Sequence, residues 1–228
     1  MKIGGLAKLT LLDYPQKVAC TVFTIGCNFR CPFCHNASLV ECRNCEQLTN
    51  EDVLSFLKKR KNVLEGVCVT GGEPLLQSGL EDFLAHVKEL GYLVKLDTNG
   101  SNPAKLQSLV QKGLVDYVAM DVKNSKAEYA KTVGCNVDLD SICQSVEFLK
   151  NCGIGYEFRT TVTKTFHTSE SIEQMAQWLV GAKQLFLQQF VDSGDLLDGS
   201  VEGPSAQTLK EYQKIIQKYL PNVYLRGV

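Results

Sequence analysis

The sequence predicts an α/β fold in which about six parallel strands form an open (β/α)6 barrel. Short runs of β-forming residues alternate with segments of helical periodicity, and the connections between them are short. Polar candidate residues follow every predicted strand, and barrel enzymes place their sites at these strand ends. A doubly wound sheet would concentrate such residues at one switch point. The distribution therefore favours the barrel.

The elements can be followed from the N-terminus. Residues 18–23 are rich in β-formers and predict a first strand that leads into a cysteine-rich loop. Residues Thr49–Asp52 have the composition of a helix N-cap with an acidic first turn. Residues 66–70 predict a short strand that is covered on both faces. Apolar residues at helical spacing over 80–90 predict a helix that ends at Gly91.

The alternation continues to the C-terminus, and no linker-like segment or short repeat interrupts it. Further strands are predicted at 92–96, 115–122, 156–162 and 183–190, with 223–226 as one more short strand. Further helices are predicted at 103–112, 139–151, 169–179 and 205–219. We therefore expect residues 1–228 to form a single domain.

Composition excludes several classes of protein. The net charge is −1, the hydrophobic fraction is 44% and the charged fraction is 21%, all of which are ordinary for a globular chain. No apolar run is long enough to cross a bilayer, and no basic tract suggests nucleic-acid binding. The N-terminus does not resemble a secretory leader. We expect a cytoplasmic protein without nucleic-acid or membrane partners, because many free thiols require a reducing compartment.

The most informative motif is the cysteine loop. Cys27, Cys31 and Cys34 follow the first predicted strand with the spacing C-x3-C-x2-C. An iron–sulfur cluster usually takes four cysteine ligands, so a loop that supplies three leaves one iron with an open position. A metal with an open position can take part in chemistry.

Two other interpretations of the cysteines were weighed. A disulfide framework is disfavoured, because a chain of this length builds a core without such cross-links. A zinc site could use Cys31 and Cys34 together with Cys42 and Cys45, which form a second C-x2-C pair. That site would leave Cys27 unused and would not explain the downstream motifs. The role of Cys42 and Cys45 stays open.

Several short motifs accompany the cysteine loop. They are Leu12-Asp13-Tyr14-Pro15, Gly71-Gly72-Glu73-Pro74, Leu96-Asp97-Thr98-Asn99-Gly100, Asp121-Val122-Lys123, Arg159-Thr160-Thr161 and Gln188-Gln189-Phe190. Together the set resembles the radical S-adenosylmethionine (radical SAM) activating enzymes of the glycyl-radical type. Within that group it most resembles the activating proteins of anaerobic (class III) ribonucleoside-triphosphate reductase. The resemblance covers nearly the whole chain and implies an open partial (β/α)6 barrel of the radical SAM type.

The resemblance also implies residue roles. The metal ligands would be Cys27, Cys31 and Cys34, which would hold a [4Fe–4S] cluster. The residues at SAM would be Phe33, Gly71, Gly72, Glu73, Asp97, Thr98, Asp121 and Lys123. In a pyruvate formate-lyase activating enzyme, the counterparts of Asp97 and Asp121 also bind a monovalent cation.

Each role has a structural alternative. Lys123 could form an ion pair with Asp121 or Asp97, and Glu73 could fix the turn that carries it. Arg159 could contact SAM, but an ion pair with an acid such as Asp13 is favoured, because a guanidinium suits a carboxylate. Phe33 could shield the iron from water. His35 is expected to order the loop, and His86 and His167 are expected to be surface or cap residues.

The activity implied by the resemblance is reductive cleavage of SAM followed by removal of a hydrogen atom from a glycine of a partner enzyme. Asp13 and Arg159 would belong to the catalytic site, with Asp13 near the glycine loop. Gln16 stands where many relatives carry glycine, so this chain departs from the family pattern in the region expected to dock the glycine loop. Ferredoxin or flavodoxin would supply the electron.

Two other functions remain open. One is radical SAM chemistry on a small molecule, such as a deazaguanine-type ring contraction, which would share the cysteine loop and the Gly-Gly-Glu turn. The other is a zinc-stabilised binding module without catalysis. Iron and acid-labile sulfide content distinguishes the zinc module from both enzymes.

Overall fold

The computed structural model describes residues 1–42, 47–192 and 194–228. The chain forms two compact units. The N-terminal unit comprises Met1–Asn28, Ser38–Thr98 and Asn102–Ala119, and the C-terminal unit comprises Phe29–Ala37, Asn99–Ser101 and Met120–Val228. That all 228 residues act as one domain stays a prediction.

The strands are arranged along one sheet in the order in which they occur in the chain, from β1 to β8. They are β1 (Ile3–Thr10), β2 (Ala19–Thr24), β3 (Gly66–Gly71), β4 (Leu93–Thr98), β5 (Tyr117–Asp121), β6 (Gly155–Val162), β7 (Leu185–Gln189) and β8 (Val223–Arg226). β1 pairs antiparallel with β2, whereas β2, β3 and β4 run parallel, as do β6, β7 and β8. The predicted succession of parallel strands is confirmed for these two sets.

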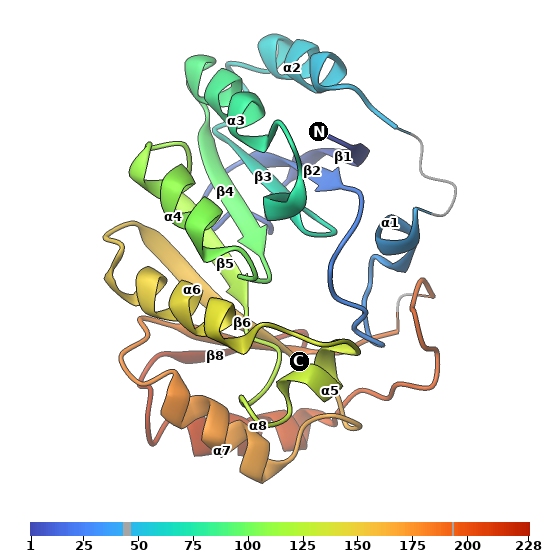
Figure 1. Cartoon of the computed structure of the whole chain (residues 1–228), viewed down its shortest axis with the longest axis vertical. Coiled ribbons are helices and arrows are strands. Elements are labelled where there is room, and N and C mark those ends of the chain that lie inside the picture. The colour runs from blue at the N-terminus through green and yellow to red at the C-terminus, as the bar shows by residue number, and fades with distance from the viewer. Residues whose placement is uncertain (43–46, 193) are drawn as a thin grey trace. The chain divides into compact units, whose positions relative to one another are not determined.

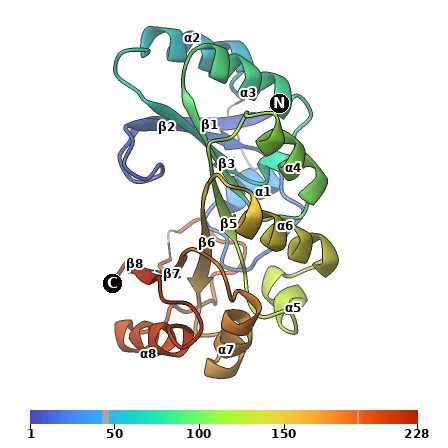
Figure 2. The same cartoon turned by 90° about the vertical axis from the view of Figure 1, so that its left-hand side faces the viewer.

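Helices follow most strands, as Figure 1 shows. They are α1 (Ala37–Glu41), α2 (Asn50–Lys59), the short 3₁₀ helix η1 (Pro74–Leu76), α3 (Leu80–Glu89), α4 (Pro103–Gln111), α5 (Tyr129–Val133), α6 (Leu139–Asn151), α7 (Ser169–Trp178) and α8 (Ala206–Ile216). Within the C-terminal unit, α7 and α8 lie side by side in both views (Figures 1 and 2). None of the helices in the described part of the chain combines the length and the apolar character needed to cross a membrane.

Local sequence explains where the helices begin and end. Thr49 caps α2 by accepting from the N–H of Asp52 at 3.1 Å, and the Asp52 carboxylate accepts from the N–H of Thr49 at 2.9 Å. This reciprocal pair is a capping box, and it confirms the predicted start of α2. α3 is followed by Gly91, whose φ of 90° is the left-handed conformation that glycine adopts at low cost.

Four elements were not predicted. β1 is an edge strand that is half exposed along most of its length, so its sequence lacks the apolar pattern of a buried strand. α1, α5 and η1 are too short for a helical period to be visible. β1 ends at Thr10, three residues before the predicted site residue Asp13.

Candidate active site

The cysteine loop begins where β2 ends. Gly26 has a φ of 93°, and its N–H donates to the carbonyl of Leu39 at 2.9 Å. A residue with a side chain would be strained in this conformation, so glycine allows the chain to turn out of the strand. Cys27 lies in the N-terminal unit, whereas Cys31 and Cys34 lie in the C-terminal unit.

The thiols of the loop match the donor set of an iron–sulfur cluster. The structure describes nine cysteines, and Cys31 is 7% exposed. Three thiols on one loop suit a [4Fe–4S] cluster with one open iron. Among the described residues, no three His, Cys, Asp or Glu side chains are gathered as a metal site. The assignment of a [4Fe–4S] cluster to this loop therefore rests on two observations. The three side chains are thiols, and they lie on one short loop.

A lysine supplies positive charge beside two of these thiols. Burial raises the pKa of Cys34, while the nearby ammonium of Lys123 acts in the opposite direction. Burial also lowers the pKa of Lys123, but the negative charges of Asp121 and Cys31 outweigh it and raise that pKa. Because cluster ligands are thiolates, a fixed cation next to Cys31 and Cys34 favours the form that binds iron.

Lys123 and Arg159 share one carboxylate. The Lys123 Nζ lies 3.0 Å from Asp121 Oδ2, and the Arg159 Nε lies 3.0 Å from Asp121 Oδ1. Burial raises the pKa of Asp121, but the two cations outweigh it and hold the pKa at about 2. Asp121 is therefore ionised at neutral pH. These contacts support the ion-pair interpretation of both cations.

Asp13 has a different partner from the one expected. The Thr21 hydroxyl on β2 donates to the Asp13 carboxylate, and the Asp13 N–H donates to Thr10 Oγ1 at 3.1 Å. The sequence suggested an ion pair between Arg159 and an acid such as Asp13, and the acid is instead Asp121. Asp13 is held by these two hydrogen bonds: Thr10 lies three residues before it, and Thr21 lies on β2, which pairs with β1.

The Gly-Gly-Glu turn packs against the start of the cysteine loop. The N–H of Gly72 donates to the carbonyl of Thr24 and the N–H of Glu73 donates to the carbonyl of Gly26, both at 2.8 Å. A Cβ on Gly72 would lie 2.0 Å from the Gly26 oxygen. The glycine is therefore required for close contact between two backbone segments, a contact that the sequence did not predict.

Glu73 is bonded within its own unit. It is 1% exposed, and its Oε1 accepts from the Thr98 hydroxyl at 2.7 Å and from the Leu75 N–H at 3.0 Å. Thr98 lies at the end of β4, so the carboxylate ties the Gly-Gly-Glu turn to the next strand. The contacts support the interpretation that Glu73 fixes the turn. Asp97, at the neighbouring position of β4, forms an ion pair with Lys95.

The aromatic residue of the loop is part of the core of the C-terminal unit. The Phe33 ring is buried, with centroids 5.9 Å from Phe166 and 6.5 Å from Phe190. His35 stacks on Phe190 with 5.3 Å between the rings. Burial lowers the pKa of His35, against a hydrogen bond to the backbone of Val191. Both residues order the loop by packing, as was expected of His35, and shielding of iron by Phe33 stays a prediction.

Comparison with protein-family models gives the family of this chain. Residues 21–179 match the model of the Radical SAM superfamily, which is most of the chain. This chain belongs to the radical SAM superfamily. The matched span includes the cysteine loop, the Gly-Gly-Glu turn and the Asp121–Arg159 ion pair. Members of the family use a [4Fe–4S] cluster and SAM, so the prediction of these two cofactors is confirmed, as is that of a radical SAM enzyme.

Individual relatives support the same assignment. The radical SAM chain is 31% identical over 236 residues to a Methanocaldococcus jannaschii protein provisionally named a glycyl-radical enzyme activating enzyme, covering 99% of this chain and 96% of the relative. It is 28% identical over 183 residues to the pyruvate formate-lyase-activating enzyme of Clostridium pasteurianum, covering 77% of this chain and 74% of the relative.

Other matches show how widely the fold is shared. A GTP 3′,8-cyclase of Helicobacter pylori is 30% identical over 156 residues, which cover 66% of this chain and 48% of the cyclase. The crystal structure of a radical SAM methyltransferase from Sphaerobacter thermophilus has a TM-score of 0.76 at 13% identity, covering 96% of this chain and 68% of that chain. The structural likeness establishes the fold, and the predicted radical SAM fold class is confirmed.

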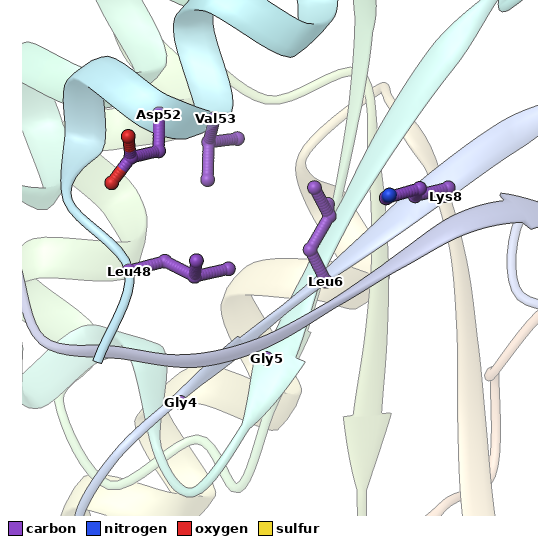
Figure 3. Close-up of a pocket in the computed structure, with 7 residues that line it drawn as sticks. All are labelled: Gly4, Gly5, Leu6, Lys8, Leu48, Asp52 and Val53. Atoms are coloured by element: carbon purple, nitrogen blue, oxygen red, sulfur yellow. The ribbon is translucent and has the colours of Figure 1, made fainter. Parts of the chain in front are cut away.

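One pocket of this radical SAM protein lies apart from the predicted residues. It has a volume of about 350 Å³ and lies between β1 and the start of α2 in the N-terminal unit. In Figure 3, Leu48 points across it toward Leu6, with Asp52 and Lys8 farther out. None of the residues that line it was predicted to bind SAM or iron. It therefore adds nothing to the candidate active site.

Sequence reasoning missed two residues of the radical SAM domain. His167 was expected to be a surface or cap residue; it directly precedes Thr168, the N-cap of α7, but it is 2% exposed. Its Nδ1 accepts from the N–H of Thr163 at 3.1 Å, and its Nε2 lies 2.9 Å from the carbonyl of Lys123. It therefore supports the backbone of Lys123. Lys95 was not singled out, although a lysine two residues before Asp97 on one strand had to share its face.

Proposed function

We propose that this radical SAM enzyme removes a hydrogen atom from a backbone glycine of a partner glycyl-radical enzyme, and that the partner is anaerobic ribonucleoside-triphosphate reductase. The observation that carries the proposal is the 31% identity to a provisionally named activating enzyme over 99% of this chain and 96% of that relative. The sequence motifs that accompany the cysteine loop support the choice of reductase.

The chain's own residues have definable tasks in this reaction. When bound, the cluster supplies the electron with which SAM is cleaved. Cys27, Cys31 and Cys34 would hold it, and the charge of Lys123 favours the thiolate form of the last two. The contact between Gly72 and Gly26 would fix the base of the loop. A ferredoxin or flavodoxin donor and a cytoplasmic location remain part of the proposal, because the thiols need reducing surroundings.

An exposed apolar segment next to Asp13 supports a protein substrate. Leu9, Leu11 and Leu12 are 61%, 69% and 90% exposed, and Asp13 follows directly. Large apolar side chains grouped on a surface favour contact with another protein. We assign this segment to the loop of the partner that carries the glycine, because the resemblance places the Asp13 region near that loop.

The test uses the anaerobically reconstituted enzyme with dithionite, SAM and purified anaerobic reductase. The expected products are methionine, 5′-deoxyadenosine and a glycyl radical on the reductase, which are measured by chromatography and electron paramagnetic resonance. A glycine-to-alanine variant of the reductase should give no radical signal. Deoxyadenosine without any glycyl radical would contradict the proposed partner and leave the radical SAM assignment intact.

The apolar segment can be tested separately. Leu12→Asp should lower the yield of glycyl radical about tenfold, because a charge in the contact opposes docking, and leave deoxyadenosine formation without partner unchanged. Val63→Asp is the matched control, since Val63 is 55% exposed in the same unit and lies outside this segment. Equal activation by the wild type and both variants would remove the segment from the partner contact.

A small-molecule reaction is the second candidate. It is favoured by the similarity to GTP 3′,8-cyclase, although the match covers 48% of that enzyme. Incubation of the reduced enzyme with SAM and GTP would decide it, with loss of GTP followed by chromatography. We expect no GTP-dependent deoxyadenosine. The zinc-module alternative does not hold for a radical SAM enzyme, and Cys45, which it required, lies outside the described residues.

A further inference from the structure

One face of the sheet in the N-terminal unit carries a polar row. Thr21 on β2 is in register with Cys68 on β3, and Cys68 is in register with Lys95 on β4. Asp97 lies two residues beyond Lys95, so both side chains lie on the same face of the strand. Polar residues at these positions contrast with Val67, Val69 and Leu96, which alternate with them and are fully buried.

The row contains a buried lysine. Lys95 is 1% exposed, and its ammonium forms an ion pair with Asp97. The Cys68 Sγ lies 3.9 Å from Lys95 Nζ and 3.7 Å from Asp97 Oδ1, which places the thiol beside both charges. Lysine is almost never fully buried unless it is paired, and an apolar side chain would fill this position without a buried charge. A lysine here therefore calls for a reason beyond packing.

The ion pair bears on the monovalent cation that the resemblance implied at Asp97 and Asp121. In the N-terminal unit, the Asp97 carboxylate already has the ammonium of Lys95. In the C-terminal unit, Asp121 already has Lys123 and Arg159. Each carboxylate is matched by side-chain cations of its own unit, so an added inorganic cation would meet positive charge as well as negative. The residues present do not fit a monovalent metal ion.

We propose that the Lys95 ammonium takes the place of that cation, so that the enzyme binds SAM without sodium or potassium. A lysine carries the same charge as such an ion, and it presents that charge at a fixed point beside Asp97. Because it is part of the chain, it is present at any ionic composition. This role concerns SAM binding and is independent of the substrate that later loses a hydrogen atom.

The test compares potassium chloride with tetramethylammonium chloride at equal ionic strength, because the organic ion is too large to replace potassium in a carboxylate site. The protein is the anaerobically reconstituted enzyme, and SAM affinity is measured by calorimetry. Wild type is expected to bind SAM equally in both salts. Lys95→Met should bind about tenfold more weakly in tetramethylammonium, with partial recovery in potassium.

Two controls keep the outcome interpretable. Lys88→Met removes a lysine–aspartate pair with Asp116 elsewhere in the same unit, where Lys88 is partly exposed, and should behave as wild type. Lys95→Met with Asp97→Asn removes both charges, so it covers the case in which the single variant fails to fold. It should bind SAM weakly in both salts, because the carboxylate that would hold potassium is gone.

A potassium-dependent melting temperature gives a readout that needs no SAM. Lys95→Met should be stabilised by potassium relative to tetramethylammonium, because an ion that binds only the folded state raises its stability. Wild type and Lys88→Met should show no difference between the salts. The proposal is overturned if wild type needs potassium for SAM binding, or if folded, cluster-loaded Lys95→Met binds SAM like wild type in tetramethylammonium.

Discussion

The two units position their candidate site residues by different means. In the N-terminal unit the Gly-Gly-Glu turn is held by backbone contact, with Gly72 against Gly26 and Glu73 tied to Thr98. In the C-terminal unit the site is held by charge, since Lys123 and Arg159 meet on Asp121. Backbone contact tolerates no added atom, whereas a charge cluster tolerates added bulk but not a lost charge. The Gly-Gly-Glu turn and the Asp121 charge cluster should therefore be destabilised by different substitutions.

The largest effect should come from the loop that both units share. Cys31→Ala removes one of three thiols and should abolish cluster binding and deoxyadenosine formation, because the loop offers no replacement thiol. Cys143→Ala is the matched control, since it removes another free thiol, on α6, far along the chain. Iron content and deoxyadenosine are measured in parallel. Equal losses in both variants would refute the assignment of the ligands.

The Gly-Gly-Glu turn of the N-terminal unit should be destabilised by the addition of one methyl group. Gly72→Ala places a Cβ 2.0 Å from the Gly26 oxygen, so the turn must move away from the base of the cysteine loop. We expect destabilisation of about 1–3 kcal/mol, as for other overpacked sites. Urea unfolding measures it. Gly5→Ala, whose Cβ would make only ordinary contacts with Phe23, should cost much less; a similar cost would contradict the role of the close contact.

Local contacts and contacts between distant segments also differ in how well the sequence predicts them. The helix N-cap at residues 49–52 is local, so residue types predicted it, and the structure adds the reciprocal bonds of a capping box. The approach of Gly72 to Gly26 depends on the register of β2 with β3, which a single sequence does not give. The motif singled out Gly72 as a residue at SAM, which stays a prediction, and it could not show that Gly72 approaches Gly26.

The ion pairs of the C-terminal unit were also only partly predictable from the sequence. An ion pair was the favoured prediction for Arg159 and one of two interpretations of Lys123, and the residue types justified both. Which acid pairs with Arg159 depends on strands that are distant in sequence, so the prediction named Asp13, whereas the partner is Asp121. The burial of His167 was missed for the same reason, since nothing in its sequence neighbours indicates that it lies against the Lys123 carbonyl. Side-chain chemistry was predictable, and pairing across the fold was not.

Removing the negative charge of Asp121 should destabilise the C-terminal unit to an intermediate degree. Asp121→Asn leaves Lys123 and Arg159 without their shared carboxylate. The Asp121 side chain is 28% exposed, so solvent compensates in part and we expect about 2 kcal/mol. Glu202→Gln, which breaks an exposed pair with Lys164, should cost under about 1 kcal/mol.

The pH dependence identifies the charge as the cause of that loss. The pKa of Asp121 is held at about 2, below its ordinary value. A carboxyl with a lowered pKa contributes stability above its unfolded pKa and loses it as pH falls through the folded one. The difference between wild type and Asp121→Asn should thus be constant from about pH 5 to 8 and shrink below about pH 4. A difference that stays unchanged in acid would indicate lost packing rather than lost charge.

The effect that is smallest at neutral pH is expected from the histidine that supports Lys123, because it appears only in acid. Burial lowers the pKa of His167 to about 4, below the ordinary value of 6.5. The unfolded chain then binds a proton between these values and the folded chain does not, so stability falls as pH is lowered through this window. The full effect is about 3 kcal/mol, of which about 2 kcal/mol is reached by pH 5. Urea midpoints from pH 5 to 7 should slope less in His167→Gln than in wild type. The exposed His86→Gln should keep the wild-type slope, and identical slopes in all three proteins would show that His167 does not remain neutral beneath the Lys123 carbonyl.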